Sequence, residues 1–192
     1  MKRITLSLPA LCLTAFLYAQ PFPISQGNFL GGGKGKLSFT SQKYLNDQKL
    51  KDTKVHLRPD FGYFPIDNWA IGANLNFEST KSKIDDQEID KSNDVGAGIW
   101  SRYYILPKTH RMNVFGEAGF NFGGSKFDDD DRISYNSFNL GVSMAYFVNS
   151  FIAFELGVEY ASKKWEDEDE RINRVALCGG FQMHFGPCTK KK

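Results

Sequence analysis

A strict two-residue alternation of apolar and polar side chains constrains this chain more than any other feature. In residues 54–64, KVHLRPDFGYF, polar or charged residues take every second position, and apolar or ring residues take the positions between them. Because successive side chains of a β-strand point to opposite faces, an extended backbone gives this segment one charged and one apolar face. The same alternation, without a sustained helical period, occurs in eight segments: 29–40, 54–64, 69–78, 94–105, 112–122, 138–146, 152–160 and 174–185.

Eight amphipathic strands can close into a ring. An even number of strands permits antiparallel neighbours throughout, and closure leaves no strand edge unpaired. Each segment also reaches the roughly 9–11 residues that a tilted strand needs to cross a bilayer. The sequence therefore predicts an all-β fold, an eight-stranded antiparallel up-and-down transmembrane β-barrel, over residues 27–185.

The connections between these segments fall into two groups that alternate along the chain. Long, charged connections are predicted near 41–52, 79–93, 124–134 and 162–171, and short ones near 65–68, 106–111 and 148–150. Outer-membrane barrels have long extracellular loops and short periplasmic turns. We therefore expect the long connections to be mobile and to lie outside the cell, at one rim of the barrel.

The two ends of the chain differ from the barrel segments. Lys2 and Arg3 precede the apolar run ITLSLPALCLTAFLY, and Ala19 then meets QPFPIS. This layout is typical of a secretory signal peptide, and the run is shorter than the ~20 residues of a membrane-spanning helix. We predict a signal peptide at 1–19, an N-terminal lead-in at 20–26 and a basic C-terminal tail at 186–192.

Charge and cysteine content exclude several classes of protein. Without residues 1–19 the chain loses two basic residues and keeps 22 basic against 22 acidic ones. This balance argues against nucleic-acid binding, which requires a basic surface. The two cysteines that remain, Cys178 and Cys188, are too few for a disulfide scaffold, and we expect them to lie too far apart to pair.

The charged face of the strands must avoid lipid. Each basic residue on the lipid face costs about 2–4 kcal/mol at the bilayer midplane, so several together would exceed a folding free energy of roughly 5–15 kcal/mol. Inside a narrow lumen the same charges can pair, and the two signs are balanced. The charged ladder expected in the lumen consists of Lys34, Lys36, Lys54, His56, Arg58, Asp60, Glu78, Asp94, Arg102, Glu117, Glu155, Glu159 and Arg174.

Aromatic residues on the apolar face favour a membrane barrel over a soluble one. A soluble lipocalin-like barrel would turn the same apolar face inward, and alternation alone does not separate the two. Membrane barrels carry aromatic girdles at the bilayer interface. The girdle expected near the short turns consists of Tyr63, Trp69, Tyr103, Tyr146 and Phe185.

Three stretches carry a family resemblance: DFGYFPIDNWAIGANLNF, VSMAYFVNSFIAFELGVEY and the closing VALCGGFQMHF. They resemble the small eight-stranded outer-membrane β-barrel proteins of Gram-negative bacteria, the OmpX-like and porin-family β-barrel domain group. The resemblance implies a monomer in the cell outer membrane, in contact with the lipid bilayer and lipopolysaccharide. It also implies insertion by the outer-membrane assembly machinery, which reads the terminal strand. In this chain GPCTKKK follows Phe185, whereas such strands usually end the chain at an aromatic residue.

No catalytic, cofactor or metal site is expected. His56, His110 and His184 lie too far apart to form one cluster, and the acidic runs DDDD and EDEDE lack the spacing of a calcium loop. GGGKGK lacks the ending of a phosphate-binding loop. The predicted function is a structural or surface-binding role, for an unknown ligand, through four charged loops above a plugged lumen. The alternatives are a narrow ion or solute pore, and an outer-membrane enzyme that would use His56 at the outer rim.

Overall fold

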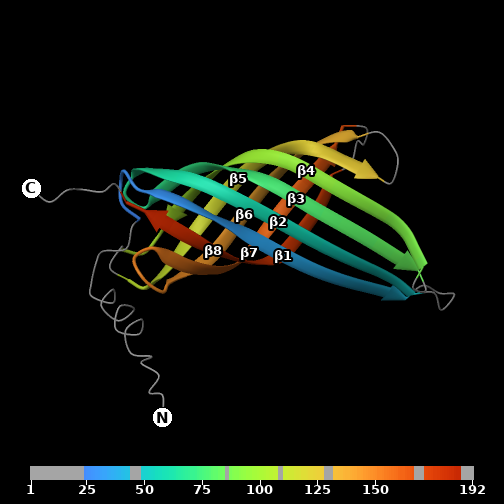
Figure 1. The fold of residues 1–192 in the computed structure, drawn as a ribbon, viewed down its shortest axis with the longest axis horizontal. Helices are drawn as coiled ribbons and strands as arrows, with labels where there is room; N and C mark the ends of the chain where they lie inside the picture. The colour runs from blue at the N-terminus through green and yellow to red at the C-terminus, as the bar shows by residue number, and fades with distance from the viewer. Residues whose placement is uncertain are drawn as a thin grey trace, which may run out of the picture.

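Eight long strands make up the computed structural model, which describes residues 24–43, 49–84, 87–107, 110–127, 132–166 and 171–186. The model is drawn in Figure 1. Within those ranges the structure is all-β, as predicted, and contains no helix long and apolar enough to cross a membrane. The strands are β1 (Phe29–Lys43), β2 (Lys49–Ile66), β3 (Trp69–Ile84), β4 (Gln87–Tyr104), β5 (Met112–Phe127), β6 (Ile133–Phe147), β7 (Ile152–Trp165) and β8 (Ile172–Phe185).

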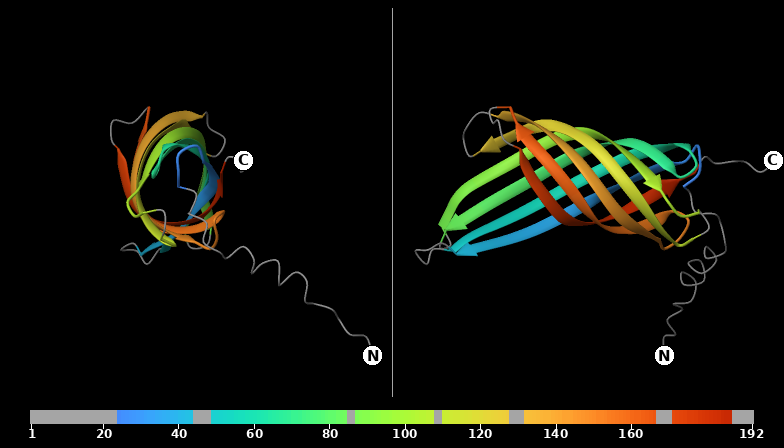
Figure 2. Two further views of the ribbon diagram at one scale, coloured as in Figure 1. Left: turned by 90° about the vertical axis from the view of Figure 1, so that its left-hand side faces the viewer. Right: turned by 180° about the vertical axis from the view of Figure 1, so that it is seen from behind.

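The strands form a closed ring in sequence order. Each strand pairs antiparallel with the next, and β1 pairs antiparallel with β8 through the register Phe29↔Phe185. The ring is visible end-on in the left view of Figure 2. The predicted up-and-down barrel is confirmed, and the described residues leave no sheet edge between β1 and β8.

The barrel has its polar side chains inside and its apolar side chains outside. Leu177, Val175 and Ile99 are 73%, 68% and 65% exposed, whereas Arg102 is fully buried and Glu117 is 5% exposed. A barrel in water would lose stability with this arrangement, because apolar surface is favourably removed from water. The exposed belt matches lipid instead, so the lipocalin-like alternative is wrong.

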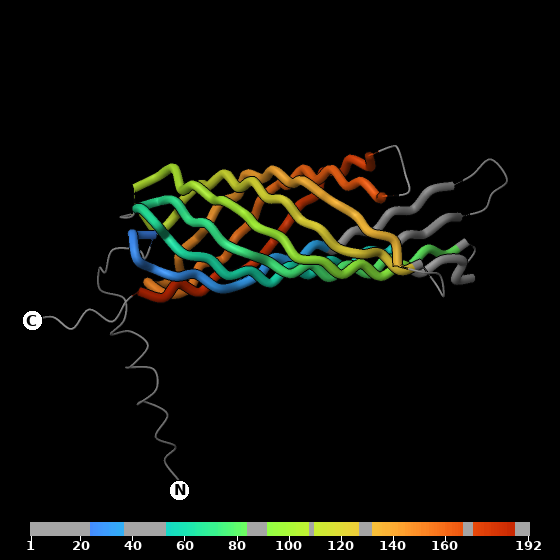
Figure 3. The backbone as a smooth tube through the Cα atoms, turned by 90° about the horizontal axis from the view of Figure 1, so that it is seen from above, coloured from blue at the N-terminus to red at the C-terminus, as the bar shows by residue number. Residues whose placement is uncertain are grey.

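The predicted difference in connection length is also wrong. Strand pairing continues through most of the segments expected as long loops, so β3 and β4 are separated only by 85–86. The connections 44–48, 85–86, 128–132 and 166–171 lie at one end of the barrel, which we call the loop rim. The opposite end, with connections 67–68, 105–111 and 148–151, is the turn rim. Figure 3 shows the start of β1 (blue) and the end of β8 (red) at the same end of the barrel, the turn rim.

Asparagine side chains shape the turn rim. Asn68 has a positive φ of 64°, a conformation that Asn tolerates better than most residues. The Asn149 Oδ1 accepts hydrogen bonds from the backbone N–H groups of Phe151 and Ile152, both at 2.8 Å. The Asn113 amide bonds the N–H and the C=O of Leu106, both at 2.9 Å. The Asn149 bonds hold the return at 148–151, and the Asn113 bonds bridge the longer connection at 105–111.

The filled lumen as candidate functional site

An apolar floor closes the lumen at the turn rim. Ile24 is fully buried, and its carbonyl accepts a 2.9 Å hydrogen bond from the Asn68 N–H. The Gly27 N–H donates to the Phe64 carbonyl and the Phe64 N–H donates to the Asn28 carbonyl, both at 2.9 Å. The predicted lead-in therefore contributes part of the floor. Other fully buried rings of the floor are Phe64, Tyr104, Phe115 and Phe147, with the ring of His184 against Phe64 and Phe147.

Trp100 fills the lumen wall above the floor. It is 3% exposed, and its Nε1–H donates to the Ala73 carbonyl at 3.1 Å. Its ring lies over Gly62 and Gly72, where an added Cβ atom would come within 2.4 Å of the indole. Two glycines on adjacent strands therefore make the space that this large side chain occupies.

Arg102 is the centre of a buried ion network. Its guanidinium donates to the Glu117 Oε2 from Nη2 at 2.6 Å and from Nε at 2.9 Å, and its Nη1 donates to the Glu155 Oε1 at 2.8 Å. Asp60 lies 3.7 Å away. The guanidinium carbon also lies 4.3 Å from the centre of the Phe115 ring. A fully buried charge requires such pairing, because an unpaired one is costly in a low dielectric.

Glu117 joins this network to the neighbouring cations. It accepts hydrogen bonds from Lys34, at 2.9 Å, and from Arg58 as well as from Arg102. The Arg58 Nη1 also reaches the Glu159 Oε2 at 3.2 Å, and Glu159 in turn pairs with Lys36. One carboxylate thus pairs with three cations from three different strands.

Two further ion pairs lie toward the loop rim. The Arg174 Nη2 lies 2.8 Å from the Glu78 Oε2, and their side chains are 35% and 15% exposed. Lys163 pairs with Asp94, and its ammonium lies 3.9 Å from the centre of the Tyr135 ring. Sequence reasoning missed Lys163, because its segment was predicted as a loop. Exposure rises along the lumen from Arg102 to Arg174, so water reaches these outer pairs first.

A cluster of amides was also missed. The Asn76 Nδ2 donates to the Oδ1 atoms of Asn74 and Asn121, at 2.8 and 2.9 Å, and the Asn121 Nδ2 donates to the Asn139 Oδ1 at 3.0 Å. All four side chains face the lumen and are at most 8% exposed. Charge balance, which revealed the ionic residues, gives no signal for neutral amides. The sequence did place these asparagines at inward-facing positions of the alternation, and that was the signal available for predicting them.

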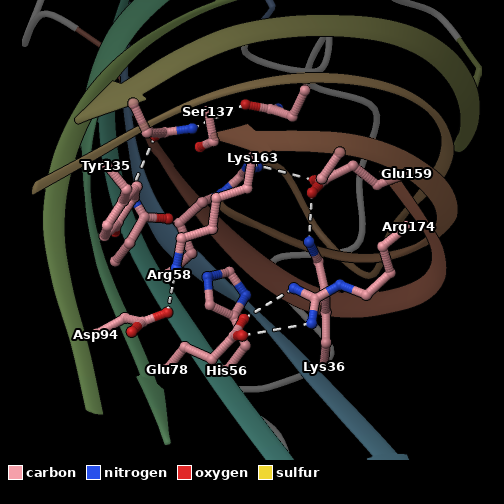
Figure 4. A pocket seen from close by; sticks show the side chains of 14 residues that line it. Lys36, His56, Arg58, Glu78, Asp94, Tyr135, Ser137, Glu159, Lys163 and Arg174 are labelled. Atoms are coloured by element: carbon pink, nitrogen blue, oxygen red, sulfur yellow. Dashed lines mark hydrogen bonds and ion pairs between the residues drawn. The ribbon is translucent and has the colours of Figure 1, made fainter. Parts of the chain in front are cut away.

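A polar cavity of about 60 Å³ remains between the ion pairs. Figure 4 shows that Lys36, His56 and Arg58, from β1 and β2, and Glu159 and Arg174, from β7 and β8, point into it. Its lining also includes Asp94, Tyr135, Ser137, Asn139 and Lys163. The remaining predicted ladder residue, Lys54, lies nearer the loop rim, in register with Thr80 on β3.

The predicted girdle residues all lie on the outer surface at the turn-rim end of their strands. They are 36–55% exposed: Tyr63, Trp69, Tyr103, Tyr146 and Phe185. Trp69 Nε1–H donates to the Ser101 Oγ at 2.7 Å, and Phe29 packs on Tyr63 with 5.1 Å between ring centres. Such amphipathic rings suit the boundary between lipid and water.

Other residues singled out in the sequence lie apart from the ion network. His110 belongs to the 105–111 connection and His184 to the floor, so neither is near the His56 cavity. Cys178 is buried as a free thiol. Cys188 and the acidic run at 128–131 lie outside the described residues. Within the described ranges no group of three or more His, Cys, Asp or Glu side chains could hold a metal ion.

The comparison with protein families identifies the architecture. A family model described as the outer membrane protein beta-barrel domain matches residues 9–185. The chain belongs to this family. It is therefore an outer-membrane β-barrel protein, located in the cell outer membrane and embedded in its lipid bilayer. No match is found among curated proteins.

Two solved structures share the fold. The outer membrane protein OprG from Pseudomonas aeruginosa is 16% identical, with a TM-score of 0.53 over 85% of this chain and 98% of that one. Neisserial surface protein A (NspA) is 11% identical, with a TM-score of 0.53 over 82% of this chain and 97% of that one. At these identities the likeness is one of fold.

Proposed function

We propose that this protein is a non-conducting barrel with a structural and surface-binding role. The filled lumen carries this proposal. An eight-stranded barrel is only just wide enough for side chains to fill its interior. Here an apolar floor, the Arg102 network and the amide cluster succeed one another along the axis, and each consists of side chains that are 8% exposed or less. A solute would have to displace paired charges to pass.

Liposome swelling tests the proposal against the narrow-pore alternative. The unmodified protein in liposomes should give no swelling with a pentose. The matched variant combines Arg102→Ala, Glu155→Ala and Phe115→Ala. It removes one ring and the ion contacts of Arg102 with Glu155, Glu117 and Asp60, while Glu117 keeps Lys34 and Arg58. This variant should admit the sugar. Robust flux through the unmodified protein would overturn the proposal and establish the pore.

Outward-facing basic residues support lipopolysaccharide as a surface partner. Lys81, Lys126 and Arg132 are exposed at the loop rim. Phe77 belongs to the exposed apolar belt. Lys81 follows Phe77 by four residues, which is about 13 Å along a strand. Lys81 therefore lies beyond the apolar belt, and basic residues near a charged membrane surface gain about 1 kcal/mol each. Replacing all three with Gln should reduce co-purified lipopolysaccharide, whereas Arg111→Gln at the turn rim should not.

The proposal places the loop rim outside the cell and assigns no catalytic role. An enzymatic His needs a partner that orients its ring, and among the described residues the His56 Nδ1 has no hydrogen-bond partner. The same proposal includes the export signal at 1–19, the tail at 186–192, a monomeric state and insertion by the outer-membrane assembly machinery.

A further inference from the structure

The cavity near the loop rim contains buried hydrogen-bond donors without acceptors. Among the described residues, the Arg58 Nε and the Asn139 Nδ2 have no hydrogen-bond partner, although these residues are only 2% and 3% exposed. Both nitrogens can only donate. The His56 Nδ1, in the same cavity, also lacks a partner in the part of the chain that the structure describes. Leaving such groups unsatisfied costs about as much as losing a hydrogen bond in the interior, so the site favours a ligand that supplies acceptors.

The charges of the lining favour a negative ligand. Four cations, Lys36, Arg58, Lys163 and Arg174, face three carboxylates, Glu78, Asp94 and Glu159. Each of the three carboxylates already pairs with a cation of the lining. Within the lining one positive charge is therefore in excess, and Arg58 also pairs with Glu117 below the cavity.

The size and position of the cavity limit the ligand further. A water requires at least about 10–15 Å³ of such volume, so 60 Å³ has room for about four water-sized groups. Arg174, with a side chain 35% exposed, and Lys163, at 18%, lie on the solvent-reachable side, whereas Arg58 is at 2%. The site is thus accessible from the loop rim and closed below by the Arg102 network.

We propose that this cavity is a binding site for a small oxyanion, such as a carboxylate of about four non-hydrogen atoms. The ligand accepts hydrogen bonds from the Arg58 Nε–H and the Asn139 amide and offsets the excess positive charge. Ligands of this size bind weakly: the best reach dissociation constants of about 40 µM. We therefore expect a dissociation constant of roughly 0.1–10 mM.

Acetate, followed by nitrogen NMR of the arginine Nε–H groups, tests the site in the full barrel in detergent micelles. Ionic strength is held constant with the sodium salt of HEPES, whose sulfonate carries a body too large for the cavity. The Arg58 signal should shift and saturate, while the signal of Arg111, exposed at the turn rim, should not. A linear Arg58 shift that matches Arg111, or no shift, would overturn the proposal.

Asn139→Asp gives a second test that preserves the amide cluster. The new carboxylate still accepts the bond from Asn121, but it replaces the free donor with negative charge. Acetate should bind at least tenfold more weakly, whereas Asn93→Asp, the same change on the outer surface of β4, should stay within twofold. Unchanged binding by folded Asn139→Asp would refute the assigned position. If this variant does not fold, the titration of the unmodified protein alone decides.

Discussion

Replacing Glu117 with Ala should strongly destabilise the barrel. Glu117 pairs with Lys34, Arg58 and Arg102, whose side chains are at most 3% exposed. Removing one partner of a buried ion pair costs about 3–5 kcal/mol, because the other charge remains buried and unpaired. Here Arg58 keeps Glu159 and Arg102 keeps Glu155, while Lys34 loses its carboxylate. We therefore expect a loss of about 3–5 kcal/mol, a large part of a total of about 5–15 kcal/mol.

Glu78→Ala is the matched control. It also removes one carboxylate from one ion pair, but Arg174, whose side chain is 35% exposed, can turn its guanidinium to water. Pairs open to solvent contribute about 0–1 kcal/mol. Urea unfolding in lipid vesicles measures both variants, with a heat-dependent gel shift as the check that each has closed into a barrel. Equal losses for the two variants would refute the argument, since they would mean that water reaches Glu117 as freely as Glu78.

Two further predictions concern the rims. Trypsin added to whole cells should cut after Arg171, which is exposed at the loop rim, and should spare Arg111, which is exposed at the turn rim. Mass spectrometry of the fragments identifies the cleavage sites. Cleavage at Arg111 alone would mean that the topology is inverted. Ile24→Ala should cost about 2–5 kcal/mol in urea unfolding, because a fully buried side chain leaves a cavity in the floor. The exposed Gln26→Ala should change stability by less than about 0.5 kcal/mol, and equal effects would show that the lead-in does not seal the lumen.

The alternation predicted the barrel well because lipid imposes it. Wherever a strand crosses the bilayer, every second side chain must be apolar, so the eight segments and their outward faces were readable. Beyond the bilayer this demand ends. Ser79, Thr80 and Lys81 on β3 still pair with β4, but both faces are polar and no period remains. That is why the strands extend well beyond their predicted ends and the long loops were overestimated.

The sequence predicted which side chains face the interior, but it did not predict which of them pair with one another. Position in the alternation fixes whether a side chain points inward, and this follows from sequence alone. Pairing depends on how far the strands are staggered around the ring: Arg58 reaches Glu117 on β5 and Glu159 on β7, 59 and 101 residues away. No local pattern encodes that stagger. Ile24 was missed for a similar reason, because one apolar residue in a Pro-containing lead-in has no period.

The buried charges can specify the stagger that the lipid-facing surface leaves open. If β5 slipped by two residues along β4, apolar side chains would still face lipid, since the side-chain period is two. The same slip would move Glu117 about 7 Å from Arg102 and leave both charges without their closest partner. We therefore predict that replacing Arg102, Lys34, Glu117 and Glu155 together with Met or Leu gives a barrel of similar or greater stability, because apolar replacement of a buried ion network is often neutral or stabilising. Its β4–β5 register, read from amide contacts by NMR, should become mixed, whereas the unmodified protein keeps Arg102↔Glu117 alone. A single native register in the apolar variant would show that turns and side-chain packing set the stagger without the charges.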